Sequence, residues 1–355
     1  MRFHVKRPNP FILTHSLSIT IVVLVAFNIH AADDAVSPQT ETAIDRALKY
    51  LAEHQTKEGT WQSDIGPSSA VTSLATMAFL ARGHTPGQGP YGEHINRSID
   101  YVLAHQMHNG LLSASNGTMY DHGASTVMLC EVFGMVDDAR KPKLEAAIAK
   151  AAKVILDAQK IPQGPHAGGW RYTITANDSD ISVTGWQLMA LRGAANCGAA
   201  VPKEALDKGV AYIRRLAVQG EGGFGYQHGG GPNRARTGTG ILSLEMLGQH
   251  TEKQPHLPEA LAGGEYLLHN PLTNPNDEFY YYSIYYGSQA ANQLGGKYWD
   301  GIYPKLRETL LQRQRPDGSW PQGPGAEGSA GPAYSTSMAV LALCVPYHYL
   351  PLYQK

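Results

Sequence analysis

The chain has 355 residues, of which 29 are Lys or Arg and 30 are Asp or Glu, and 43% of all residues are hydrophobic. This composition is typical of a globular protein and argues against an intrinsically disordered chain. The isoelectric point is near 6.9, and no basic run occurs beyond the first few residues. Phosphate binding needs concentrated Lys and Arg, so we expect no nucleic-acid partner.

The N-terminal segment resembles a targeting signal. Arg2, Lys6 and Arg7 precede an uncharged apolar run over residues 17–27, and small residues follow it. This pattern predicts a secretory signal peptide over residues 1–31 and export to the periplasm or the extracellular space. The run is shorter than the ~20 residues that span a bilayer, but a retained N-terminal anchor remains the alternative. Association with a membrane surface and the oligomeric state are left open.

The chain contains three cysteines, Cys130, Cys197 and Cys344, and no CxxC motif. An odd and sparse count is not a disulfide framework. Each cysteine lies in or beside an apolar helical segment. We therefore expect small buried hydrophobic side chains at these positions.

The rest of the chain is a sixfold repeat of two helices joined by a turn rich in Gly and aromatic residues. The two helical segments of each repeat cover, in chain order, 43–55 and 69–83, 95–106 and 124–136, 144–159 and 181–194, 206–219 and 237–249, 257–270 and 279–293, and 303–314 and 334–347. The landmark residues at or next to the ends of the first segments are Gln55, Gln106, Gln159, Gln219, His269 and Gln314. A period of this length is typical of a helical repeat architecture.

Within each repeat, the first helix carries charges along one face, whereas the second is apolar or small on all sides. An amphipathic helix faces water on one side, and a helix that is apolar all round is buried. The pattern predicts six outer and six inner helices in two concentric rings. An open solenoid would need polar end repeats, but the last inner helix is as apolar as the others. We therefore predict an all-α fold in which residues 41–355 form one closed domain, preceded by a linker over residues 32–40.

The Gln-x3-Gly-x-Trp motif occurs at Gln55/Gly59/Trp61 and again at Gln314/Gly318/Trp320. With the helical-hairpin period and the acidic third turn, it resembles the squalene cyclase and protein prenyltransferase superfamily over residues 40–350. The resemblance implies an α/α toroid. It is specific for the fold and not for the activity, since unrelated functions share one fold.

The third turn carries the first candidate catalytic residues, Asp178 and Asp180, two positions apart and just before an inner helix. Neighbouring buried carboxylates raise each other's pKa, so one of them can hold a proton near neutral pH. The segment resembles the acidic motif of triterpene cyclases at both Asp positions and conservatively at Ser182, but Ile181 stands where the last Asp is expected. The alternative is that these residues cap the helix.

Other turns that enter inner helices add further candidates. His122 lies in a Tyr-Asp-His-Gly sequence before the second inner helix, and His228 lies in the fourth turn; both are considered catalytic candidates. Arg234 and Arg236 in the fourth turn could hold an anion. A single His or acid at a helix start is more often a structural residue than a catalyst.

Aromatic residues are expected to line the central cavity. Trp170 and Trp186 flank the third turn, and Tyr281 and Tyr285 share one face of the tyrosine-rich fifth inner helix. Aromatic faces stabilise cations and also stack on sugar rings. The alternative for these rings is ordinary core packing.

No metal site or cofactor is predicted. The chain has no HExxH, no Cys pair and no Asp-x-Cys of the kind that holds zinc in protein prenyltransferases, so only scattered ligands such as His122 and His228 could bind a metal. Three functions remain open. The first is acid-initiated cyclase or isomerase chemistry on an apolar or isoprenoid ligand. The second is an exported enzyme that acts on a glycan, and the third is a non-catalytic binding or scaffold protein.

Overall fold

The computed structural model describes residues 36–64, 66–114 and 117–354. The predicted signal peptide lies outside these residues. The described chain folds into twelve α-helices joined by turns and short 3-10 helices, with isolated β-bridges and no strand longer than a bridge. In the same ranges no helix combines the length and apolarity that a membrane crossing requires.

The helices alternate between an outer and an inner ring. The outer helices are α2 (Pro38–Glu53), α4 (Gly92–Ala104), α6 (Lys141–Ala158), α8 (Lys203–Arg215), α10 (Pro258–His269) and α12 (Gly296–Arg313). The inner helices are α3 (Ser69–Ala81), α5 (Met119–Val132), α7 (Ile181–Asn196), α9 (Arg234–Leu247), α11 (Tyr280–Leu294) and α13 (Gly331–Leu343). Three 3-10 helices follow α12 or α13: η1 (Gly325–Ala330), η2 (Val345–Tyr347) and η3 (Pro351–Tyr353).

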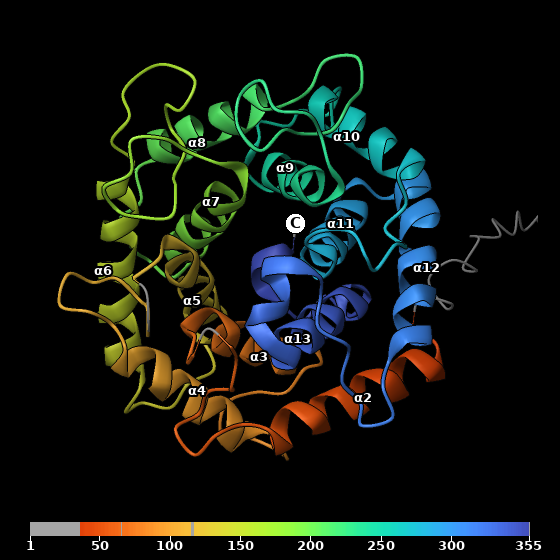
Figure 1. Ribbon diagram of the computed structural model, residues 1–355. Helices are drawn as coiled ribbons and strands as arrows, with labels where there is room; N and C mark the ends of the chain where they lie inside the picture. Colours follow the sequence, from red (N-terminus) through yellow and green to blue (C-terminus); the bar gives the residue numbers. More distant parts are fainter. Residues whose placement is uncertain (1–35, 65, 115–116, 355) are drawn as a thin grey trace, which may run out of the picture.

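Both rings are closed. Each inner helix packs against the next one, and α13 packs against α3 to complete the inner ring, while α12 contacts α2 in the outer ring. Figure 1 shows the two concentric rings viewed along their common axis. The predicted α/α toroid of six helical hairpins is confirmed.

In the first, third and sixth repeats, the outer helix is followed by a turn that contains a buried Trp, namely Trp61, Trp170 or Trp320. Gln55 donates its amide to the carbonyl of Gly59 at 3.1 Å and to that of His94, in the next outer helix, at 2.9 Å. Trp61 is buried, and its indole N–H donates to the Leu51 carbonyl at 2.8 Å. The indole bond satisfies a carbonyl group that the end of α2 leaves without a partner, and the Gln55 amide joins the turn to α4. The predicted structural role of this motif is confirmed.

Helix α2 begins earlier than the predicted domain boundary. Its first residue is Pro38, within the segment that we expected to be a linker. Ser37 caps the helix by accepting a hydrogen bond from the Thr40 N–H at 3.2 Å, and Pro38 occupies the first turn, where its missing N–H costs nothing.

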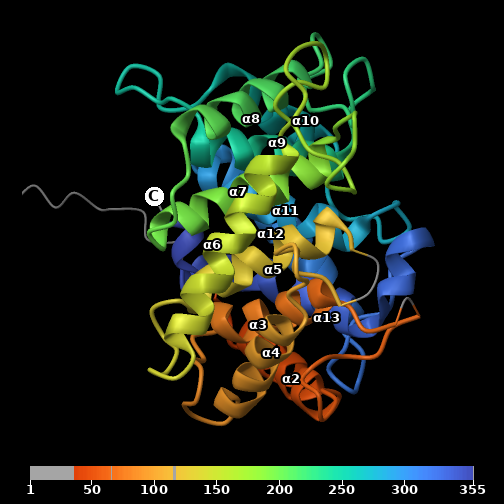
Figure 2. The same cartoon turned by 90° about the vertical axis from the view of Figure 1, so that its left-hand side faces the viewer.

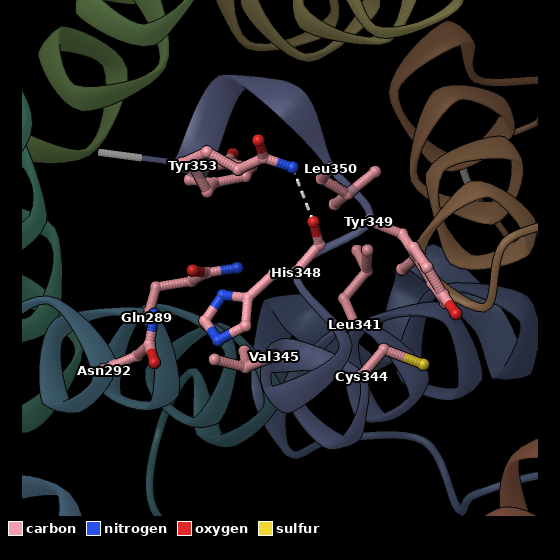
Figure 3. Close-up of a pocket in the computed structure, with 11 residues that line it drawn as sticks. Gln289, Asn292, Leu341, Cys344, Val345, His348, Tyr349, Leu350 and Tyr353 are labelled. Atoms are coloured by element: carbon pink, nitrogen blue, oxygen red, sulfur yellow. Dashed lines mark hydrogen bonds between the residues drawn. The ribbon is translucent and has the colours of Figure 1, made fainter.

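The chain end closes one side of the ring. Tyr353 is buried, and its hydroxyl lies 2.5 Å from that of Tyr285 in α11. The Leu352 N–H donates to Glu131 at the end of α5. Figures 1 and 2 show the C-terminus on the ring axis, at one end of the toroid. A pocket of about 20 Å³ remains between the chain end and helices α11 and α13, with room for about one water molecule (Figure 3).

Candidate functional site

The opposite end of the ring contains a cavity of about 580 Å³. It opens among the first turns of the six inner helices. Each of these helices contributes residues three or four positions apart, which share one helix face. The pairs are Val71 and Leu74, Tyr120 and Ala124, Ser182 and Trp186, Asn233 and Arg236, Phe279 and Tyr282, and Tyr334 and Met338. The prediction that the turns entering the inner helices surround one mouth of a central cavity is confirmed.

The tyrosines of the cavity use their hydroxyl groups within the protein. The Tyr282 hydroxyl lies 2.8 Å from Thr239 Oγ1 and also bonds to Tyr120. The Tyr334 hydroxyl donates to Glu327 at 3.2 Å. These hydroxyls are partnered, so a ligand would meet mainly aromatic rings, together with the aliphatic side chains between them.

Asp121 lines the cavity and is held by four hydrogen bonds. One carboxylate oxygen accepts from Ser68 Oγ and the Ala70 N–H, each at 3.0 Å. The other accepts from Thr118 Oγ1 at 2.8 Å and Ser113 Oγ at 3.3 Å. This carboxylate therefore joins the first turns of α3 and α5, and its accepting positions are taken.

Glu327, from η1, is the second buried acid of the cavity. Its carboxylate accepts the backbone N–H groups of Tyr281 at 3.1 Å and Tyr282 at 2.9 Å. It thus caps α11, whose own N-cap residue, Phe279, provides no side-chain bond and adopts a left-handed conformation with φ of 56°. Burial raises the pKa of Glu327, while the backbone N–H bonds act in the opposite direction.

The rim of the cavity carries both charges, since the partly exposed Arg236 and the exposed Glu278 line it. The Arg171 and Arg236 guanidinium groups lie 5.4 and 5.2 Å from the ring centre of Tyr226. Arg171 also pairs with Asp178 at 2.7 Å. Asp178 is thus a partly exposed partner of Arg171 and does not line the cavity.

Asp180 is buried and caps helix α7. Its Oδ1 accepts the N–H groups of Ser182 and Val183, both at 2.9 Å. Its Oδ2 lies 3.3 Å from Arg171 Nε. Burial raises the pKa of Asp180 to about 6, although the Val183 N–H and the Arg171 guanidinium both lower it. Asp180 does not line the cavity, but its neighbour Ser182 does.

The two predicted histidines lie apart from each other and from the cavity lining. His122 is buried, and its ring bonds to the Leu112 N–H at 2.9 Å and the Ala151 carbonyl at 3.1 Å. Burial lowers the pKa of His122 to about 4, so the ring is neutral and joins α5 to the preceding turn and to α6. His228 is exposed in the loop before α9.

Of the predicted ligand-binding residues, some line the cavity and others have structural contacts elsewhere. Trp186 and Arg236 line the cavity. Trp170 instead donates its indole N–H to the Ile155 carbonyl at 2.7 Å, the same role that Trp61 has in the first repeat. Arg234 pairs with Asp277 at 2.7 Å.

The two predicted tyrosines of α11 are buried away from the cavity. Tyr281 packs edge-on against Tyr280, and its hydroxyl is close to Arg313 of the outer ring. Tyr285 stacks on Trp186 and bonds to the chain end through Tyr353. On α11 it is Phe279 and Tyr282 that face the cavity.

No residue group in the described ranges brings together three His, Cys, Asp or Glu side chains in the manner of a metal site. The titratable groups that line the cavity are Asp121, Glu278, Glu327, Arg236 and the tyrosines. From the sequence, the turn that contains Asp121 was expected to contribute a catalytic residue, but His122 was the candidate there. Glu327 was not among the candidates.

No protein-family model matches the chain, and no curated protein matches its sequence. Solved structures do match its fold. The type II terpene cyclase MstE from Scytonema has a TM-score of 0.57 and 15% identity over 88% of this chain and 99% of its own. The α-1,6-mannanase GH76A from Salegentibacter sp. HEL1_6 has a TM-score of 0.63 and 13% identity over 86% and 99%. A D-mannose isomerase has a TM-score of 0.63 and 14% identity over 92% and 100%.

At these identities the likeness establishes the α/α-toroid fold and no specific function. It includes enzymes that act on different chemical classes. One MstE variant was solved with geranylgeranyl dihydroxybenzoate as substrate, and a GH76A variant was solved with α-1,6-mannotriose. Whether the ligand of this protein is a terpenoid or a sugar must therefore be argued from the side chains that line its own cavity.

Proposed function

We propose that this protein binds an apolar ligand of the isoprenoid class in its central cavity. The observation that carries the proposal is that polar side chains in the cavity wall already make hydrogen bonds within the protein. Asp121 accepts four hydrogen bonds, and the hydroxyls of Tyr282 and Tyr334 are engaged with Thr239 and Glu327. Between them lie the Trp186 ring and the aliphatic side chains. Such a surface gains free energy by covering apolar area. The charged side chains Arg236 and Glu278, which also line the cavity, are partly or fully exposed, so they can meet a polar end of the ligand.

A glycan is the alternative that the mannanase likeness raises. Sugar binding and glycoside cleavage need side chains that can donate or accept hydrogen bonds, and cleavage uses a pair of carboxyl groups. Displacing any of the four donors from Asp121 would leave buried polar atoms without partners, at a cost of about 1–3 kcal/mol each. The cavity favours the isoprenoid for this reason.

The reaction that we propose for the bound ligand is acid-initiated isomerisation or cyclisation. The Glu327 carboxyl transfers its proton to one carbon of an alkene, the π electrons form the new C–H bond, and the other carbon becomes cationic. The rings of Tyr282, Tyr334 and Trp186 stabilise this cation through their quadrupoles. Loss of a proton from the product cation returns the acid to its starting state. Asp180, the donor predicted from the sequence, is the competing candidate, since burial also favours its protonated form.

The binding test uses tritiated geranylgeraniol, delivered from cyclodextrin, in equilibrium dialysis with the whole protein. Ala70 lies at the partly exposed mouth of the cavity, so Ala70→Trp should obstruct it. Ala149 is exposed on the outer helix α6, and Ala149→Trp is the matched control. We expect saturable binding by the wild type and the control, and at least a tenfold loss in Ala70→Trp. Binding of mannotriose in place of geranylgeraniol would refute the proposal.

The catalytic part is tested separately, with chromatography and mass spectrometry of the recovered ligand. Glu327→Gln should abolish product formation and retain binding, and Asp180→Asn should retain both. If Asp180→Asn alone abolishes turnover, the acid is Asp180. If the wild type binds geranylgeraniol and forms no product from it or from related polyenes, the protein is a non-catalytic binder.

We also propose that the protein acts after export. The support is the sequence pattern of residues 1–31. Expression in a bacterial host followed by cell fractionation and N-terminal sequencing tests this proposal. A mature N-terminus near Ala32 in the exported fraction is expected, and an uncleaved cytoplasmic product would contradict it.

A further inference from the structure

Two cysteines from neighbouring inner helices meet near the end of the ring that the chain end covers. Cys130 lies in α5, and Cys197 is the C-cap residue of α7. The Cys197 thiol lies 3.7 Å from the Cys130 carbonyl oxygen, and the two thiols also hydrogen bond to each other. Both residues are partly buried and unoxidised.

The backbones of α5 and α7 approach closely at this point. A Cβ atom at Gly193 would lie 2.9 Å from Cys130 Cβ and 3.2 Å from its Sγ. The glycine therefore removes the side chain that would otherwise separate the helices. Cys197 follows Gly193 by four residues and is thus on the same side of the helix. A disulfide needs Cα atoms about 4.4–6.8 Å apart and Cβ atoms about 3.5–4.5 Å apart, which helices in such contact can provide.

We infer that Cys130 and Cys197 form an intramolecular disulfide that joins α5 to α7. The oxidant is a second disulfide, either of a small thiol such as glutathione or of a thiol–disulfide oxidoreductase. The Cys197 thiolate attacks this disulfide, forms a mixed disulfide and releases one thiolate of the oxidant. The Cys130 thiolate then attacks the Cys197 sulfur and releases the second. Two protein thiols are oxidised, one external disulfide is reduced to two thiols, and the two protons pass to the released thiolates or to solvent.

The environment of the pair gives each thiol a separate part. The hydrogen bond from Cys130 lowers the pKa of the Cys197 thiol, and Cys197 is accessible at the helix end. Cys197 is therefore the attacking residue. The same hydrogen bond, together with burial, raises the pKa of Cys130, which disfavours its thiolate. Cys130 resolves the mixed disulfide because the sulfur that it attacks belongs to its own hydrogen-bond partner, a proximity that Cys344 does not share.

Cys344 provides an internal control. It is buried at the end of α13, and burial raises the pKa of its thiol. A protonated and enclosed thiol reacts slowly with disulfides. The odd number of cysteines is thus explained as one reactive pair and one core residue.

The experiment incubates the whole reduced protein with oxidised glutathione, blocks the remaining thiols with iodoacetamide and measures intact mass and tryptic peptides. We expect the free thiols to fall from three to one. The expected mass change before alkylation is a loss of about 2 Da, because two hydrogens leave. A peptide that links Cys130 to Cys197 should appear and should vanish on reduction.

Three variants show why the result arises. Cys344→Ser should still lose two thiols, whereas Cys197→Ser should form no cross-link. Cys130→Ser removes the resolving thiol, so it should stop at a glutathione adduct on Cys197, a gain of about 305 Da. A wild type that keeps three free thiols, or that retains glutathione on Cys197 without the cross-link, would overturn the inference.

Discussion

The replacement Trp61→Ala tests the structural role of the repeated turn. Trp61 is 1% exposed, and its indole N–H donates to the Leu51 carbonyl at 2.8 Å. Removing the side chain leaves a cavity between outer and inner helices, and such Trp→Ala changes cost about 3–5 kcal/mol. The Leu51 carbonyl also loses a partner, which places this site in the upper part of that range.

The free-energy loss converts into a shift of the melting temperature. For roughly 320 ordered residues at about 2.1 cal/mol/K each, the unfolding entropy is about 0.7 kcal/mol/K. A loss of 3–5 kcal/mol therefore corresponds to a decrease of about 4–7 °C. Differential scanning calorimetry at matched scan rates measures it.

Two controls separate the contributions. Trp61→Phe retains most of the buried ring and loses the hydrogen bond, so its cost should be about 1–2 kcal/mol. Met107 is 48% exposed in the corresponding turn of the second repeat, and Met107→Ala should change stability by less than about 0.5 kcal/mol. If Trp61→Ala melts at the wild-type temperature, the assigned role of the motif is wrong.

Three further predictions concern stability. Burial raises the pKa of Glu131 to about 8 from 4.5, so the folded state holds a proton that the unfolded state has released. The wild type should therefore lose a few kcal/mol of stability relative to Glu131→Gln as pH rises from about 4.5 to 8, as measured by denaturant titration. If the difference in stability between the two proteins does not change with pH, this prediction is wrong. Gly59→Ala places a Cβ 2.4 Å from a backbone oxygen of α4 and should lower the free energy of unfolding by more than about 2 kcal/mol. Gly66→Ala meets no atom within 4 Å and should lower it by about 1 kcal/mol. Equal melting temperatures of the two variants would refute this distinction. Asp180→Ala should lower stability by about 1–2 kcal/mol, and Asp180→Asn by much less, because an amide oxygen can still cap α7. If Asp180→Asn lowers the melting temperature as much as Asp180→Ala does, the charge of Asp180 matters and not only the cap.

The fold could be predicted from the sequence because its signals are local and repeated. Helix periodicity distinguishes the outer helices from the inner ones, and Gln55 and Trp61 form bonds within a few residues or to the next helix. The apolar last inner helix indicated closure of the ring. Each of these features depends on residues of a single helical hairpin or of two neighbouring hairpins.

The cavity lining could not be predicted in the same way, because it depends on the rotation of each inner helix about its own axis. On α5 the neighbours Asp121 and His122 point in different directions, and only Asp121 reaches the cavity. On α11 the cavity residue is Tyr282, whereas Tyr281 lies toward the outer ring. A tyrosine-rich sequence indicates an aromatic wall without showing which rings form it.

Glu327 escaped prediction for a different reason. It lies in a short 3-10 helix, and the N–H groups that it accepts belong to Tyr281 and Tyr282, 46 and 45 residues earlier in the chain. No sequence pattern connects an acid in one turn to an uncapped helix in another repeat. The need for such a partner becomes visible only when Phe279 is seen to leave α11 without a cap.

The most direct test of ligand binding in the cavity is an NMR titration of protein labelled with ¹³C at the methionine methyl groups. Met338 lines the cavity, and Met107 is exposed on the outer surface. On addition of geranylgeraniol, we predict a saturable shift of the Met338 methyl signal and no shift of the Met107 signal. A Met338 signal that stays in place while the ligand is bound, or a shift confined to Met107, would contradict the proposed function.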